Sequence, residues 1–118
     1  MRRITHLAAG LLVFAAFVTF GCVCSYADEA RKPSVELGKI LFNDPSVGTN
    51  GKACSTCHPS EKKAGELAAR GEWFGGRAKT LEQAVNICIT GPLEGKPLSE
   101  NSVELKSIAM YMKSLIKK

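Results

Sequence analysis

Three residues of chemically versatile types lie together near the middle of the chain, in the segment Cys54-Ser55-Thr56-Cys57-His58. Two cysteines that are separated by two residues and followed at once by a histidine could form part of a zinc site, a redox-active dithiol, a disulfide, or a covalent anchor for haem c. Each alternative makes a different demand on the rest of the sequence, so the remaining residues decide between them.

The rest of the sequence disfavours the first three alternatives. A zinc site needs four ligands, and Cys88 could supply a third, but the direct succession of Cys57 and His58 suits tetrahedral coordination poorly. A thioredoxin-like dithiol needs a strand–helix–strand context that the sequence lacks. A bare disulfide between Cys54 and Cys57 would close too short a loop to add much stability, and it would leave His58 without a role.

Covalent haem explains all three residues together. The two thiols would bond to the two vinyl-derived carbons of the porphyrin, and the adjacent imidazole would bind the iron as its proximal ligand. We therefore predict one covalently bound haem c, an iron cofactor, attached through Cys54 and Cys57 and coordinated by His58.

The N-terminal residues have the pattern of a secretory signal. Arg2 and Arg3 precede an almost wholly apolar run over residues 7–23, and Ser25-Tyr26-Ala27 has small residues where a signal peptidase would cleave. We predict a signal peptide over residues 1–27, a single domain over residues 28–118, and a periplasmic location.

Two alternatives to cleavage stay open. An uncleaved segment would associate the protein with the membrane, although the apolar run is near the lower limit for a transmembrane helix. Lipidation of Cys22 is the other alternative: Gly21-Cys22 fits a lipobox, but Thr19 and Phe20 before it do not.

The charge and composition of the chain narrow the kinds of partner that we expect. Cleavage would leave 14 basic and 11 acidic residues, a mild net charge of +3, and roughly 91 residues, enough for one small domain if a cofactor adds to the core. The lysines are scattered without interleaved aromatic residues, so we expect no nucleic-acid partner. His58 would be the only histidine left, and Cys88 would be an odd third cysteine.

The elements that must position these residues are helical. Ser34 can cap a helix that ends near residue 42, and a break over residues 43–51 then leads into the cysteine motif. Gly38 inside this helix costs about 1 kcal/mol relative to alanine, so we expect it at a close contact with another backbone. The apolar stripe of this helix comprises Leu37, Ile40 and Leu41.

Two later helices are indicated by their caps. Thr80 and Gln83 form a capping box, and this helix ends before Gly91-Pro92, which places Cys88 on its buried face in the last turn. Asn101 and Glu104 form a similar start for a last helix over about residues 102–117. The apolar face of the last helix comprises Leu105, Ile108, Tyr111, Met112 and Leu115.

The region between these helices is less regular. Residues 60–70 suit a short helix on an exposed face, and Trp73 and Phe74 follow in a glycine-rich loop, where we expect them to line the haem pocket. Arg77, or with less support Arg70, could pair with a haem propionate. No segment alternates as a strand, so we predict an all-α fold of three to four helices around one haem.

Two stretches resemble class I cytochromes c. The stretch from Val35 to Pro59, VELGKILFNDPSVGTNGKACSTCHP, is similar to their opening, and LKSIAMYMKSL is similar to their last helix. In that family an aromatic residue of the last helix packs against a glycine of the first, and Tyr111 and Gly38 match those two positions. The resemblance implies a small class I cytochrome c-like domain.

The sixth position on the predicted iron departs from that family's pattern. Class I members usually supply a methionine from the loop before the last helix, but residues 91–102 contain none. No second histidine would remain beside His58, so the candidates are Cys88, Met112, Met110 or an open position. We favour Cys88 because it points inward at the end of a helix and has no other partner.

The second half of the chain also resembles the SoxA-type cytochromes, the haem subunits of thiosulfate-oxidising complexes. Val85-Asn86-Ile87-Cys88 fits their aliphatic-Asn-x-Cys pattern, and residues 93–98 fit their Leu-x-Gly-Lys-x-Leu loop. The ligating cysteine of that family falls on Cys88, where it can also carry the sulfur substrate as a persulfide.

These observations favour a carrier of single electrons between periplasmic redox proteins, or toward a reductase or oxidase, over an enzyme. A thiolate from Cys88 would stabilise Fe(III) and lower the reduction potential. The alternative is a SoxA-like haem component of a sulfur-oxidising enzyme complex. Residues 41–58 are also similar to di-haem peroxidases, but a second haem motif is missing.

Overall fold

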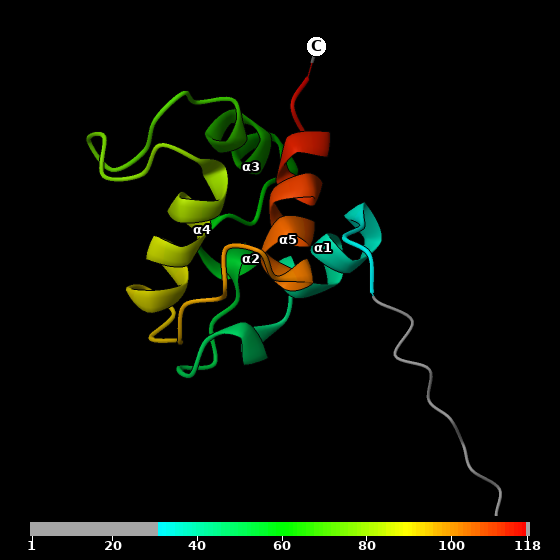
Figure 1. The fold of residues 1–118 in the computed structure, drawn as a ribbon, viewed down its shortest axis with the longest axis vertical. Coiled ribbons are helices and arrows are strands. Elements are labelled where there is room, and N and C mark those ends of the chain that lie inside the picture. The colour runs from blue at the N-terminus through cyan, green and yellow to red at the C-terminus, as the bar shows by residue number, and fades with distance from the viewer. Residues whose placement is uncertain (1–30, 118) are drawn as a thin grey trace, which may run out of the picture.

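Five α-helices and one short 3₁₀ turn make up the regular structure of residues 31–117 (Figure 1). The computed structural model describes residues 31–117, so the predicted signal peptide and the alternative lipidation of Cys22 lie outside the described residues. The elements are α1 (Val35–Phe42), the 3₁₀ turn η1 (Pro45–Val47), α2 (Cys54–Cys57), α3 (Glu61–Ala68), α4 (Leu81–Thr90) and α5 (Val103–Ser114).

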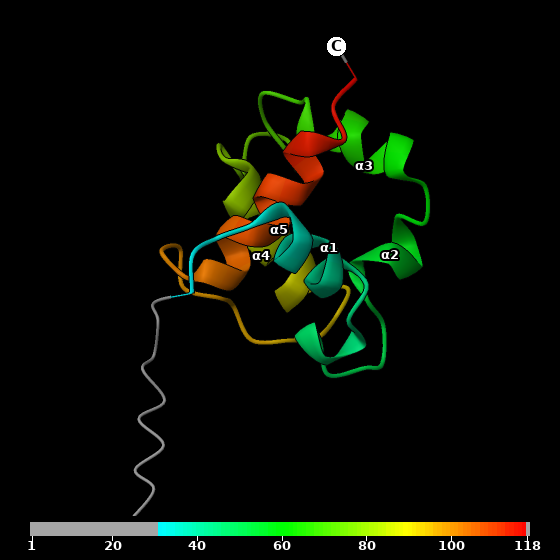
Figure 2. The same cartoon turned by 90° about the vertical axis from the view of Figure 1, so that its right-hand side faces the viewer.

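The last helix organises the others. Helix α5 lies between α4 and α1 in Figure 1, and it contacts α1, α3 and α4. Its most extensive contact is with α1, which crosses it closely in Figure 2. The buried side chains of this core are mostly aliphatic, with Phe42 and Tyr111 stacked edge to face at a ring-centroid distance of 5.4 Å.

The crossing of α1 and α5 depends on Gly38. A Cβ atom at this position would overlap the main-chain carbonyl of Ser107 and would lie 2.8 Å from the Cβ atom of Tyr111. The predicted close approach of Gly38 to another backbone is therefore confirmed, and Tyr111 is the aromatic residue beside it. Ser107 is fully buried here, and its hydroxyl oxygen accepts a hydrogen bond from the Ser34 N–H at 3.1 Å.

Side-chain caps fix where the helices begin. The hydroxyl oxygens of Ser34 and Thr80 accept hydrogen bonds from Leu37 N–H at 3.1 Å and Gln83 N–H at 3.2 Å, as predicted. The prediction that Asn101 begins the last helix was wrong by one residue. Ser102 is the cap, and its hydroxyl oxygen accepts from Leu105 N–H at 3.2 Å.

The predicted apolar stripe of the first helix was partly wrong. Ile40 is 64% exposed, because α1 turns its Gly38 and Phe42 side toward α5 and leaves the opposite side to solvent. Within residues 31–117 the fold is all-α and contains no strand, as predicted. The sequence did not indicate α2, so the described part of the chain has five α-helices where three to four were expected.

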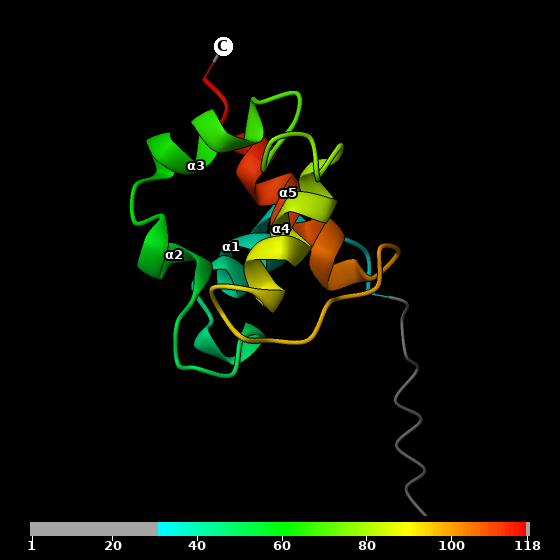
Figure 3. The ribbon, with the colours of Figure 1, turned by 90° about the vertical axis from the view of Figure 1, so that its left-hand side faces the viewer.

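The loop between α4 and α5 is tied to the segment that precedes α2. Thr49 N–H donates to the Leu93 carbonyl at 2.9 Å, and Asn50 Nδ2 donates to the Pro92 carbonyl at 2.9 Å. The far end of the loop is held by Asn86, whose amide bonds both main-chain groups of Leu98. Figure 3 shows this loop running below α4 toward α5.

No helix within residues 31–117 is long and apolar enough to span a lipid bilayer.

Candidate functional site

The cysteine–histidine motif lies on a single turn of helix. Helix α2 comprises Cys54 to Cys57, so the two cysteines are three positions apart and share one face of the turn. The Thr56 hydroxyl oxygen accepts from Ala53 N–H at 3.0 Å and closes the start of this turn. The His58 N–H donates to the Cys54 carbonyl at 3.0 Å, which places the histidine directly at the helix end.

This turn forms one end of a cavity of about 520 Å³. Cys54, Cys57 and His58 all contact the cavity, although Cys54 is buried and Cys57 is exposed. The volume is within the range of roughly 300–1,000 Å³ that is common for small-molecule and cofactor sites. Nearly all of the lining is apolar, and it includes Phe42, Leu67, Leu81, Val85, Leu93 and Met112.

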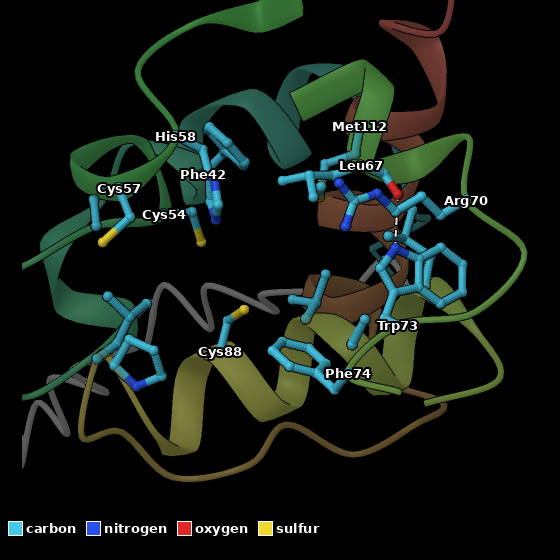
Figure 4. A pocket seen from close by; sticks show the side chains of 16 residues that line it. Phe42, Cys54, Cys57, His58, Leu67, Arg70, Trp73, Phe74, Cys88 and Met112 are labelled. Atoms are coloured by element: carbon cyan, nitrogen blue, oxygen red, sulfur yellow. Dashed lines mark hydrogen bonds between the residues drawn. The ribbon is translucent and has the colours of Figure 1, made fainter. Parts of the chain in front are cut away.

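Helix α4 contributes a third sulfur atom to the cavity. Cys88 is half-buried and lines the cavity from α4, while Cys54 and His58 line it from the motif (Figure 4). Burial, and to a smaller extent the nearby Cys88 and Cys57 sulfurs, raise the pKa of the Cys54 thiol to about 11. Burial, and then Cys57, likewise raise the pKa of Cys88. Cys54 and Cys88 therefore both lie in an apolar part of the cavity.

The two aromatic residues of the glycine-rich loop also lie on the cavity wall. Trp73 and Ala78 pair through two main-chain hydrogen bonds of 3.1 and 3.2 Å, and the Trp73 indole Nε1–H donates to the Leu67 carbonyl at 2.7 Å. Phe74, at the next position, has a φ of 53°, a conformation that bulky residues adopt at a cost of about 1–3 kcal/mol. The loop holds both rings at the cavity (Figure 4).

Of the two candidate methionines and the two candidate arginines, one of each lines the cavity. Met112 is buried and lines the cavity from α5, whereas Met110 is 40% exposed and does not line it. Arg70 lines the cavity, whereas Arg77 does not. Pairing of either arginine with a propionate stays a prediction, but Arg70 is the one that lies on the cavity wall, whereas Arg77 lies in the exposed loop closed by Trp73 and Ala78.

Sequence reasoning missed two features of the site. Helix α2 is too short for a periodicity signal, and only the spacing of its cysteines and the hydroxyl of Thr56 could have indicated it. The second feature is the role of Leu81 and Val85 on α4. Both side chains are buried from solvent, and both line the cavity.

The cavity lining includes side chains that can bind metals, but few of them are grouped. Within residues 31–117, no group of three or more His, Cys, Asp and Glu side chains is placed to hold a metal ion. An iron held by a porphyrin would need only one or two protein ligands, and the donors that line the cavity are His58 and the sulfur atoms of Cys54, Cys57, Cys88 and Met112.

No family model, curated protein or solved structure matches this chain.

Proposed function

We propose that the chain is a c-type cytochrome, a protein that holds one haem covalently and uses it to transfer single electrons. Within that class, we propose a small carrier of low reduction potential whose iron is bound by His58 and Cys88. The observation that carries the proposal is the apolar cavity, which both cysteines of the C-x-x-C-H motif, its histidine and Cys88 contact together.

The residues of the motif would attach the haem in two ways, through carbon–sulfur bonds and through the iron. Each thiol of Cys54 and Cys57 would add across one vinyl group, forming a carbon–sulfur bond while its hydrogen passes to the neighbouring vinyl carbon. His58 would donate an imidazole nitrogen to the iron, which supplies the Fe(III)/Fe(II) couple when the haem is bound. The apolar lining would exclude water from the macrocycle.

Two sulfur side chains compete for the sixth position. Cys88 and Met112 both line the cavity, so the placement of these residues supports either as a ligand. Met112 is also part of the buried core on α5, where packing alone accounts for it. Cys88 is half-buried and lies outside that core cluster. We therefore assign the sixth position to Cys88, whose thiolate charge would favour Fe(III).

Two variants test the assignment. Cys88→Ala should change the absorption and electron paramagnetic resonance spectra of the oxidised protein. It should also raise the equilibrium constant for reduction roughly a hundredfold, because an anionic ligand is lost. Met112→Leu should leave both properties unchanged and should cost less than about 1.5 kcal/mol of stability. The reverse pattern of spectral changes would transfer the sixth position to Met112.

Electron partners would approach the exposed edge of the cavity. Cys57 and Phe74 are both exposed and both line the cavity, so the attached cofactor would come close to the surface between them. We propose periplasmic redox proteins as donor and acceptor, meeting this edge through small, transient contacts.

One observation favours a second function, that of a SoxA-like haem component of a thiosulfate-oxidising complex. The sulfur of Cys88 lines the same cavity as the motif, so it could carry a sulfur substrate next to the iron. Thiosulfate added to the oxidised protein, alone and with candidate partner proteins, separates the two functions. An electron carrier stays oxidised with thiosulfate alone, whereas thiosulfate-dependent reduction that is lost in Cys88→Ala would favour the enzyme.

A further inference from the structure

One side chain of the cavity lining is permanently charged. Arg70 lies just after α3 and lines a cavity whose other members are apolar except for the motif and Cys88. A guanidinium group stays protonated at every pH at which proteins are folded. A cation beside an apolar cavity favours a ligand that carries a negative charge at that point.

Arg70 has no anionic partner of its own among residues 31–117. The ion pairs of that part of the chain all involve lysines, which pair with Glu61, Glu66, Glu72 and Glu82. Figure 4 shows the guanidinium group of Arg70 extending over the cavity. Its five N–H donors are therefore free to bind a carboxylate in the forked geometry that arginine provides.

The indole N–H of Trp73 is not free to bind such a carboxylate. Its Nε1–H already donates to the Leu67 carbonyl at 2.7 Å, so the Trp73 ring contributes apolar surface to the cavity. Phe74 has no polar group to offer. Arg70 is thus the charged donor of the Trp73 side of the cavity.

The position of Arg70 along the cavity indicates how a ligand would be oriented in it. In Figure 4 the motif cysteines lie at one end, and Arg70 lies with Trp73 at the other. A haem bound through its vinyl groups carries its two propionates on the opposite edge of the ring. A ligand that is anchored at one edge and anionic at the other matches the order of these residues along the cavity.

We propose that Arg70 binds the propionate carboxylates of the haem and thereby sets which edge of the ring points away from α2; this inference rests on the proposed function. The positive charge of Arg70 also disfavours the ferric state, because that state carries one more positive charge than the ferrous state. Arg70 is a binding residue, and it also tunes the equilibrium constant for reduction.

The test measures that equilibrium constant in the exported holoprotein and in three variants. Arg70→Gln removes the charge, Arg70→Lys keeps it but loses the planar fork, and Arg77→Gln removes a charge that does not line the cavity. Arg70→Gln should lower the equilibrium constant for reduction about threefold to tenfold. Arg70→Lys should recover most of that loss, and Arg77→Gln should lie near the wild type.

A second measurement needs no variant. The side-chain Nε–H resonances of Arg70 and Arg77 can be compared by nuclear magnetic resonance in the ferric and ferrous states, and a large paramagnetic shift is expected for Arg70 only.

Equal effects of Arg70→Gln and Arg77→Gln, or equal shifts of the two resonances, would overturn the assignment of Arg70. A protein without a haem adduct would instead overturn the proposed function, so the two failures are distinguishable. Arg70 and Arg77 are both exposed, so loss of the fold is not expected in any of these variants.

Discussion

The helix contact at Gly38 and the cavity beside α2 are two regions of one small molecule that differ in how closely the chain packs. At the helix contact, α1 and α5 meet backbone to backbone, and no atom could be added at Gly38 without a collision. At the cavity, the surrounding elements leave about 520 Å³ between their side chains. Phe42 belongs to both regions, because it packs on Tyr111 and also lines the cavity.

This difference separates a region that the chain completes by itself from a region that, under the proposed function, a bound haem would complete. Direct contact between helices stabilises the first region through dispersion and apolar burial. The second region exposes apolar side chains to an opening, an arrangement that is stable when a large apolar group fills it. Changes in the two regions should therefore have different consequences.

The largest expected effect on stability comes from Gly38→Ala, which would break the helix contact. The added methyl group overlaps the Ser107 carbonyl, so α1 and α5 must separate, at a cost of about 3 kcal/mol in the free energy of unfolding. Denaturant unfolding of the holoprotein measures the loss. Gly71→Ala is the matched control, because a Cβ atom there meets nothing within 4 Å, and it should change stability by less than about 0.5 kcal/mol. Similar losses in both variants would contradict the helix contact.

A smaller effect is expected from Trp73→Phe, which alters the cavity wall. The change removes the donor to the Leu67 carbonyl and some apolar surface, so the free energy of unfolding should fall by about 1–2 kcal/mol. The neighbouring variant Phe74→Leu loses no hydrogen bond and should cost less. If Phe74→Leu proved the more destabilising of the two, the Trp73 hydrogen bond would not be what anchors the loop.

The smallest expected effect concerns Tyr111, which joins the two regions through Phe42. Burial, the charge of Glu61 and the hydrogen bond from the Tyr111 hydroxyl to Glu61 raise the pKa of Tyr111 above its ordinary value of 10.0. The unfolded chain then ionises before the folded one, so this contribution to stability is present below pH 10 and is lost as the pH rises through the folded-state pKa.

Tyr111→Phe should remove that alkaline loss while changing stability little at pH 7. Unfolding curves of the variant and the wild type across the alkaline range test this, since other titrating groups are common to both. Curves that stay parallel above pH 10 would show that Tyr111 makes no such contribution.

Much of the helix contact could be predicted from the sequence. The cap at Ser34, the close approach of Gly38 and the buried face of α5 follow from local preferences and from a repeat of three to four residues, which a single helix records in its own sequence. Ile40 is the exception. A stripe of three apolar residues on a short helix cannot say which side meets its neighbour.

For the cavity, the sequence predicted the residues that could bind a cofactor and the aromatic residues Trp73 and Phe74, but not the arginine that lines it. Cys54, Cys57, His58 and Cys88 stand out by type and spacing, and they line one cavity. The choice between Arg70 and Arg77 depends on where a loop closes, and that closure is set by the pairing of Trp73 with Ala78. Two arginines that are seven positions apart in a loop give no local signal of which one lines the cavity.

The most direct test of the central claim is the mass of the denatured protein, purified after export from a host that has the machinery for cytochrome c maturation. A covalent haem withstands denaturation, so the account predicts a polypeptide heavier by one haem, with the extra mass lost when Cys54 and Cys57 are both replaced by alanine. A wild-type protein with the mass of the bare polypeptide would contradict it.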